Sequence, residues 1–145
     1  MSFEFLKLAG KISLPNEGID NRVFWLGAVG VRKDGTMVNS RNGVVRFTPP
    51  TQDFQYIYSS HAEGRVLQKM DVGGTLYVSR VARVDYRFAM ARPCPHCQRL
   101  IRAKGIKKVF YTVNSEQYGI WQVEKDEDRI YNFKESYNFS SHCVH

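Results

Sequence analysis

The chain has 145 residues, a length that suits one domain with a single hydrophobic core. Its composition, with 43% hydrophobic residues, 24% charged residues and only 5 prolines, excludes disordered, collagen-like and low-complexity chains. Lys and Arg number 21 against 14 Asp and Glu, and this net charge of +7 favours an anionic partner such as a nucleotide or a nucleic acid.

The sequence contains no apolar run as long as a membrane span, and its first residues lack the features of a signal peptide. We therefore expect residues 1–145 to form a single cytoplasmic domain without a membrane partner. Three cysteines in a cytoplasmic chain argue against a disulfide framework.

The first half of the chain predicts a β-hairpin followed by a helix. Residues 23–32 and 36–42 are β-prone runs, and the Asp34-Gly35 pair between them favours a tight turn. A helix is expected from residue 61, because apolar residues then recur at helical spacing and Ser60 can serve as its N-cap.

The second half of the chain alternates between strand and helix patterns. The expected elements are a strand over 75–83, a helix over 94–104 that stops at Gly105, and strands over 108–113 and 119–125. We expect the stretch "EDRIYNFKESYNF" to form a final helix with Ile130, Tyr131 and Phe133 partly buried.

This alternation predicts an α/β fold with three α-β-α layers, in which helices pack on both faces of a mixed five-stranded sheet. At least part of the sheet should be parallel. The helices that begin near residues 61 and 94 should then start side by side, at the carboxyl ends of the strands.

The stretch "ARPCPHCQRL" contains Cys94 and Cys97, whose spacing allows both thiolates to bind one tetrahedral zinc ion where a loop becomes a helix. A thioredoxin-like redox pair, or two cysteines that only happen to lie close together, are the alternatives. His96 between them is poorly placed for the same metal ion and is interpreted as a surface or pocket residue. The terminal group His142, Cys143 and His145 is a weaker candidate for a second metal site.

His61 and Glu63 stand at the start of the helix expected from residue 61. A histidine in the first turn can direct its ring out of the helix end, so His61 completes a set of three metal ligands with Cys94 and Cys97. Three protein ligands leave the fourth position to water, as in catalytic zinc sites, where the pKa of the bound water falls to about 7. Glu63 is then placed to act as general acid and base.

The motif "HAE", followed about thirty residues later by "PCPHC", is similar to the signature H-x-E…P-C-x-x-C of zinc nucleobase deaminases. The stretch "FLKLAGKISL" resembles the first helix of these proteins, "VFWLGAVGVRKDGTMVNSRNG" the opening hairpin, and "GTLYVSRV" and "IKKVFYTV" the strands around the second metal helix. Over most of residues 3–125 the chain resembles the cytidine and deoxycytidylate deaminase superfamily in its compact single-domain form. The resemblance implies Zn²⁺ as cofactor and the hydrolytic conversion of cytosine to uracil.

The resemblance also implies that an asparagine after the opening hairpin contacts the sugar of the substrate. Asn42 matches this position, and Asn39 is close enough in the chain to be the alternative. Both asparagines also suit a turn that has no function. Ala62, between His61 and Glu63, is a further candidate for a substrate contact.

Arginines and aromatic residues are the evidence on whether the substrate is a free nucleotide or a nucleic-acid strand. Arg92, together with Arg83 and Arg87, fits either a phosphate-binding group or a solvated strand face. Stacking of the bases of a single strand would need exposed aromatic side chains, for which Tyr118 is a candidate. Tyr118, Tyr111 and Trp121 are expected in or beside the loop after the fourth strand, although aromatic residues near a strand end also suit a core.

The compact length, together with the resemblance of "GTLYVSRV" and "RLIRAKGIKKVFYT" to nucleotide deaminases, favours a free cytosine nucleotide or nucleoside such as dCMP. Its pocket would be closed by loops or by a neighbouring subunit of a homo-oligomer. The alternatives are a cytosine deaminase acting on single-stranded DNA or RNA, an adenosine deaminase acting on RNA, and a zinc-containing nucleic-acid-binding module without activity. Glu63 argues against the last alternative, because a structural zinc site has no need of an unliganded carboxylate.

Overall fold

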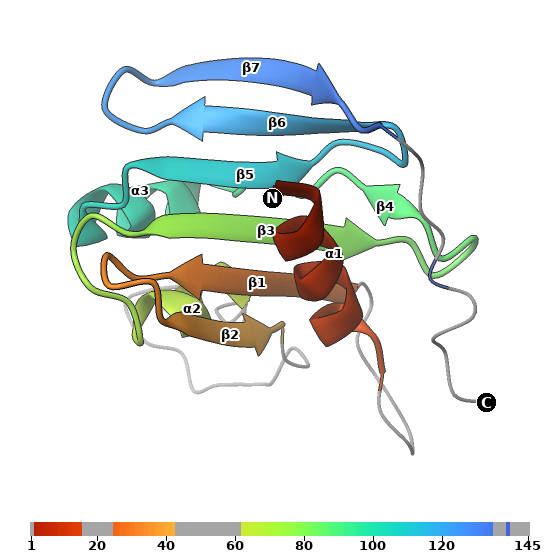
Figure 1. The fold of residues 1–145 in the computed structure, drawn as a ribbon, viewed down its shortest axis with the longest axis horizontal. Coiled ribbons are helices and arrows are strands. Elements are labelled where there is room, and N and C mark those ends of the chain that lie inside the picture. The colour runs from red at the N-terminus through yellow and green to blue at the C-terminus, as the bar shows by residue number, and fades with distance from the viewer. Residues whose placement is uncertain (1, 16–24, 43–61, 135–138, 140–145) are drawn as a thin grey trace, which may run out of the picture.

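The computed structural model describes residues 2–15, 25–42, 62–134 and 139, which form one sheet with helices on its two faces (Figure 1). In chain order the elements are α1 (Ser2–Ser13), β1 (Trp25–Val31), β2 (Met37–Arg41), α2 (Ala62–Leu67), β3 (Thr75–Val81), β4 (Phe88–Ala89), α3 (Pro95–Lys104), β5 (Lys108–Thr112), β6 (Gln117–Gln122) and β7 (Glu127–Asn132). None of the described helices is both long and apolar enough to cross a membrane.

The sheet has the strand order β2-β1-β3-β5-β6-β7, and the short β4 pairs with β3 outside this path. β3 and β5 are parallel and are joined through α3, whereas the other strand pairs are antiparallel. The expected α/β class and mixed sheet are therefore confirmed. The sheet has seven strands where five were expected, because β4 and β7 join it.

The final helix expected in "EDRIYNFKESYNF" is wrong, because Glu127–Asn132 forms strand β7, antiparallel to β6. Asp126 precedes it with a φ of 53°, a left-handed conformation that tight turns use and that Asp tolerates. The free edge of β6 offers backbone hydrogen bonds that outweigh the helical tendency of this segment. Ile130 and Tyr131 are exposed on the strand, while Phe133 beyond it is half-buried.

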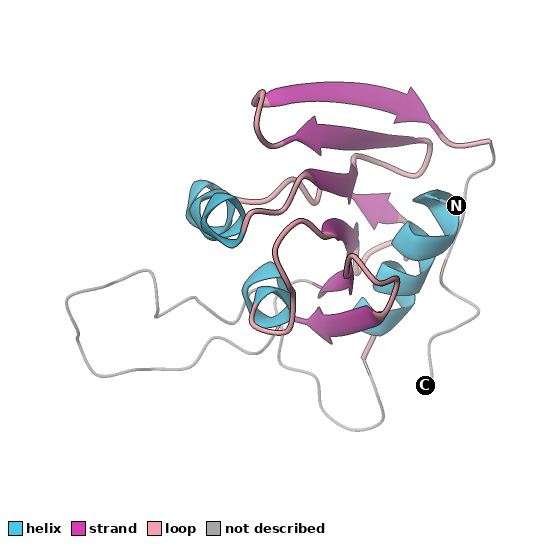
Figure 2. Cartoon of the chain, turned by 60° about the vertical axis from the view of Figure 1, so that its left-hand side comes forward, coloured by secondary structure: helices cyan, strands magenta, loops and turns pink. Residues whose placement is uncertain are grey.

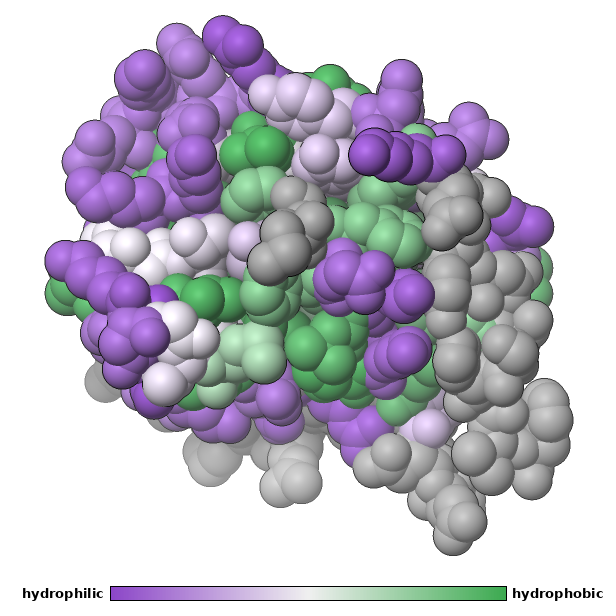
Figure 3. Space-filling view, in the orientation of Figure 1, coloured by the Kyte–Doolittle hydropathy of each residue, from purple (hydrophilic) through white to green (hydrophobic). Residues whose placement is uncertain are grey.

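The expected three layers are confirmed: α1 covers one face of the sheet, and α2 and α3 lie side by side on the other (Figures 1 and 2). α1 packs closely on β1 because Gly27 has no side chain, and a Cβ atom there would lie 1.9 Å from the carbonyl oxygen of Ala9. Figure 3, drawn from the α1 side, shows hydrophobic side chains along the middle of this face and hydrophilic ones around it.

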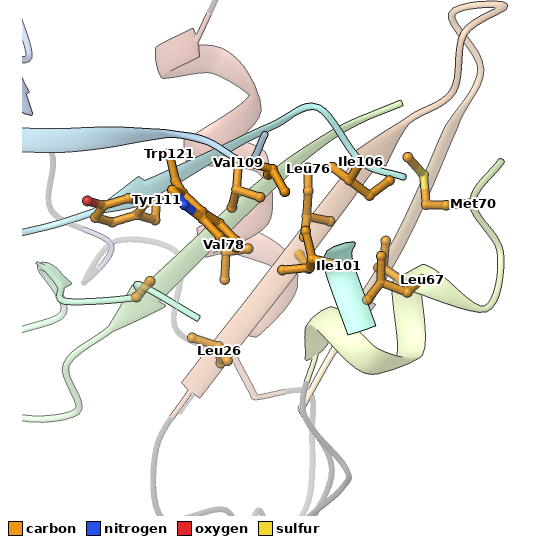
Figure 4. Packing of buried hydrophobic residues seen from close by; sticks show 14 residues of the cluster. Leu26, Leu67, Met70, Leu76, Val78, Ile101, Ile106, Val109, Tyr111 and Trp121 are labelled. Carbon is orange, nitrogen blue, oxygen red and sulfur yellow. The ribbon is translucent and has the colours of Figure 1, made fainter. Parts of the chain in front are cut away.

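The core between the sheet and the helices α2 and α3 is a single cluster of buried side chains (Figure 4). Val66, Leu67 and Met70 come from α2 and the turn after it, and Ile101 comes from α3. They pack on apolar residues of β1, β3, β5 and β6, including Trp121. This packing sets the positions at which α2 and α3 begin.

Two turn predictions are confirmed by backbone geometry. Gly35 has a φ of 89° in the hairpin between β1 and β2, where Asp34 Oδ1 accepts the backbone N–H of Thr36 at 2.9 Å. Gly105 ends α3 in the left-handed conformation, with a φ of 76°, as a C-cap glycine does.

Candidate active site

The starts of α2 and α3 lie at one end of the sheet, on the face opposite to α1. α3 begins after β3 and β4 and leads back to the parallel strand β5, so its first residue lies at the carboxyl end of β3. α2 leads into the start of β3, so it also begins toward that end. In open α/β sheets this is the edge at which ligands bind.

Cys94 and Cys97 occupy the first turn of α3. Cys94 is the N-cap residue, its backbone is extended with φ −69° and ψ 165°, and no side-chain cap hydrogen bond is made. Cys97 lies on the first turn with only 1% of its surface exposed. Neither Cys94 nor Cys97 forms a disulfide bond. Two thiol groups at the N-terminus of one helix suit zinc, because the helix dipole stabilises thiolates and zinc favours sulfur ligands.

The other predicted members of the site begin α2. Ala62 is its first residue and Glu63 its second, so the predicted general base and one candidate substrate contact follow directly on residue 61. The predicted third ligand, His61, lies outside the described residues, as do His142, Cys143 and His145. Within the part of the chain that the structure describes, no three His, Cys, Asp or Glu residues form a metal-binding group.

Asn42 follows β2 and is buried at the same end of the sheet. Its side-chain Oδ1 accepts the backbone N–H of Leu26 at 2.9 Å, and its own backbone N–H donates to the Leu26 carbonyl oxygen at 2.9 Å. Leu26 belongs to the core beneath α2 and α3. Asn39 instead pairs with Val29, whose side chain packs in the cluster around α1. Of the two asparagines, Asn42 therefore lies on the face of the site.

The segment between β4 and α3 is held by hydrogen bonds on both sides. The backbone N–H of Ala91 donates to the Thr112 carbonyl oxygen at 2.9 Å, and Thr112 Oγ1 donates to the Ala89 carbonyl oxygen at 2.7 Å. Gln98 Nε2 donates to the Pro93 carbonyl oxygen at 2.8 Å. This segment carries Cys94, so its position sets the position of one predicted metal ligand.

Arg92 in this segment binds Asp128 of β7 through two hydrogen bonds. Its Nε and Nη2 donate to the two carboxylate oxygens of Asp128, each at 2.9 Å. The Tyr111 hydroxyl donates to Asp128 Oδ2 at 2.5 Å. The hydrogen bonds from Arg92 hold the pKa of the Asp128 carboxyl below its ordinary value of 3.8. Burial, aided by the bond to Asp128, raises the pKa of Tyr111 to about 12.

Sequence reasoning missed Asp128, because it placed this residue in a helix. Ile130 and Tyr131 are residue types that favour strands, but only the pairing with β6 places Asp128 beside Arg92. The other two arginines lie elsewhere. Arg83 and Arg87 are exposed in and after the turn that follows β3, and the Arg83 guanidinium lies 5.7 Å from the ring of Trp25.

Two of the three aromatic residues expected in or beside the loop after the fourth strand flank the loop between β5 and β6: Tyr111 lies near the end of β5 and Tyr118 near the start of β6, while Trp121 lies farther along β6. Tyr111 in β5 and Trp121 in β6 are buried in the core beneath α2 and α3. Tyr118 in β6 lies on the α1 face, where its ring stacks on Tyr131 with the ring centres 5.5 Å apart. The structure thus gathers the starts of α2 and α3 with Asn42, and it places Tyr118 on the opposite face of the sheet.

Comparison with known proteins gives one family. The model of the cytidine and deoxycytidylate deaminase zinc-binding region matches residues 4–113. The matched segment runs from α1 to β5, and it includes the starts of both α2 and α3. No curated protein matches the chain.

Proposed function

Because the chain belongs to the cytidine and deoxycytidylate deaminase family, we propose that it converts cytosine to uracil in a free (deoxy)cytidine nucleotide such as dCMP. The observation that carries this proposal is the meeting of the two helix starts, with the thiols of Cys94 and Cys97 on one of them and Glu63 on the other. The matched family region binds zinc, and thiol ligands at a helix N-terminus fit that metal ion.

In this proposal His61, Cys94 and Cys97 hold the zinc ion. Bound zinc lowers the pKa of a water molecule and so supplies the nucleophile at neutral pH. Glu63 accepts a proton from this water, protonates the ring nitrogen N3, and delivers a proton to the departing amine. A C4–O bond forms, the C4–N bond breaks, and ammonia and uracil are the products.

Asn42 and Ala62 are the proposed contacts to the substrate. Asn42 is fixed by two hydrogen bonds to Leu26, and such preorganisation suits a side chain that positions a sugar. Arg92 is left out of the proposal as a phosphate-binding group, because its guanidinium already binds the Asp128 carboxylate through a bidentate contact.

A free nucleotide is proposed because, among the described residues, the three aromatic candidates for stacking the bases of a nucleic-acid strand are engaged elsewhere. Tyr111 and Trp121 are buried, and Tyr118 stacks with other rings on the α1 face. Binding of single-stranded nucleic acid needs exposed aromatic rings beside the site, on which the bases can stack. The proposal includes a cytoplasmic location, which agrees with two described cysteines, Cys94 and Cys97, that are not in a disulfide. It also allows a neighbouring subunit to close the pocket.

A substrate panel tests this proposal. Cytidine, deoxycytidine, CMP, dCMP, single-stranded DNA, single-stranded RNA and adenosine-containing RNA are each incubated with the protein, and base conversion is followed by mass. We expect conversion of the cytosine monomers alone. Faster conversion of single-stranded DNA, with a rate that falls steeply with salt, would show that the substrate is a strand.

The residue roles are tested by substitution and metal analysis. Glu63→Gln should retain zinc and the fold but lose activity by about 100-fold or more, because Glu63 transfers protons at more than one step. Cys94→Ser and Cys97→Ser should lose zinc and stability together. Full zinc retention by both cysteine variants would contradict the ligand assignment.

A further inference from the structure

Cys94 is preceded by a segment with little conformational freedom of its own. Pro93 and Pro95 flank Cys94, and proline fixes its own φ and restricts the residue before it to extended conformations. The extended backbone of Cys94 agrees with this restriction. The position of the segment is then decided by a few anchors, of which the Arg92 side chain is the longest.

Arg92 is anchored by a residue on a strand far from the segment that carries it. Its two bonds to Asp128 span from the segment before α3, across β5 and β6, to the outermost strand β7. The side chains of Arg92 and Asp128 are 35% and 26% exposed, so water screens this bidentate contact less than an ordinary surface ion pair.

Asp128 is itself held in place from the core. The Tyr111 ring lies across β6 and donates its hydroxyl to Asp128, and Figure 4 shows the hydroxyl pointing away from the core cluster. Gly119 makes this route possible, because a Cβ atom there would lie 2.3 Å from the Tyr111 ring. Arg92 also packs over the ring of Trp121, 5.6 Å from its centre.

We infer that Asp128 is a positioning residue for the metal site, which holds the segment carrying Cys94 through the side chain of Arg92. This inference rests on the proposed function, since it takes Cys94 to be a zinc ligand. Residues around metal ligands that fix ligand orientation contribute strongly to metal affinity. Strand β7 therefore contributes to the metal site although none of its residues binds the metal.

The chain offers a matched control for Asp128. Asp126 also binds an arginine, with Arg102 Nη2 at 3.1 Å, and also accepts a hydrogen bond from an aromatic residue, Trp121 Nε1, at 2.9 Å. Arg102 lies in the last turn of α3, at the opposite end of this helix from Cys94. Asp126→Asn therefore removes a similar contact without touching the metal segment.

The test uses the full chain loaded with Zn²⁺ or with Co²⁺. Zinc release to a chromogenic chelator is timed, and the thiolate-to-cobalt absorption in the near ultraviolet reports the geometry of the cysteine ligands. Asp128→Asn should release zinc about tenfold faster and change the cobalt spectrum. Asp126→Asn should release zinc at the parent's rate with the parent's spectrum.

A double-mutant cycle shows whether Asp128 acts through Arg92. Arg92→Lys keeps the charge but loses the bidentate contact, so it should also accelerate zinc release. Adding Asp128→Asn to Arg92→Lys should then change the rate little, because both substitutions break the same link. Additive effects of the two substitutions would overturn the inference.

The remaining outcomes separate this inference from the proposed function. If the parent chain binds neither zinc nor cobalt, the proposed function fails and the inference fails with it. If the parent binds both and Asp128→Asn matches it in rate and spectrum, only the inference is overturned. If Asp128→Asn does not fold, Tyr111→Phe decides: faster zinc release supports the inference, and an unchanged rate overturns it.

Discussion

The contact between α1 and β1 makes Gly27→Ala a sharp test of the packing of the fold. In a strand, alanine in place of glycine normally stabilises the protein by about 0.5–1 kcal/mol, because it reduces the entropy of the unfolded chain. At Gly27 the new Cβ atom would lie 1.9 Å from the Ala9 carbonyl oxygen, whereas ordinary contact begins at 3.4 Å. The backbone of α1 must therefore withdraw by about 1.5 Å, the difference between these distances.

This withdrawal is costly because α1 is anchored by side chains with no exposed surface, Leu6 and Ala9. Overpacking of this kind costs about 1–3 kcal/mol, and we expect the upper end because the atoms in the way belong to the backbone. For a domain of this size, about 3 kcal/mol lowers the melting temperature by roughly 10 °C. Zinc content below the transition should stay unchanged, since α1 lies on the face opposite to the site.

Gly30→Ala is the matched control in the same strand. Its Cβ atom would lie 2.3 Å from the sulfur of Met70 and 2.9 Å from Cγ1 of Val66, which are side-chain and not backbone atoms. Because the Met70 side chain is flexible, we expect a loss of about 1 kcal/mol. Urea unfolding followed by far-ultraviolet circular dichroism gives the free energy of unfolding of each variant. A Gly27→Ala variant as stable as Gly30→Ala would refute the packing argument.

Three further predictions concern the core, pH and the metal. Ile101→Ala should lower the free energy of unfolding by about 3 kcal/mol, because the Ile101 side chain has no exposed surface. Leu100→Ala should lower it by under about 1 kcal/mol, because Leu100 is 36% exposed. If urea unfolding ranks the two variants the other way, the face of α3 that packs on the sheet is wrongly assigned. In chelator-treated protein the stabilisation by Asp128 should be full above pH 3.8 and should be lost as the pH falls through the lowered pKa of this residue in the folded state. The free energies of unfolding of the parent and of Asp128→Asn, measured by urea titration, should therefore converge at low pH. Removal of zinc with a chelator should lower the melting temperature and its return should restore it, since a ligand that binds only the folded state stabilises it; an unchanged melting temperature would speak against a folded-state metal site.

The elements that sequence reasoning predicted well are those with a local signal. The Asp34-Gly35 turn and the end of α3 at Gly105 depend on backbone conformations that few residue types adopt readily. The presence of these residue types therefore predicts the turn and the helix end. The cysteine pair is local in the same sense, because its spacing on one helix start is visible in the chain. The family match over residues 4–113 agrees with this motif and with the fold expected from it.

The elements that sequence reasoning missed depend on partners far away in the chain. The pattern of residues 127–132 suits a helix or a strand, and the free edge of β6 decides between them. The sequence allowed Tyr118 to stack on a base of bound single-stranded nucleic acid, but its position in β6 places it on the α1 face.

The sequence by itself therefore determined the deaminase motif, the α/β class and the turns, since each rests on neighbouring residues. Only the tertiary structure decided which side chains surround the motif. Arg92 and Asp128 are 36 residues apart, and no spacing rule joins them. They meet because β7 adds to the sheet beyond β6 and because Gly119 leaves room for Tyr111 to lie across that strand. Contacts of this kind arise from strand order and steric fit, which are properties of the folded chain as a whole.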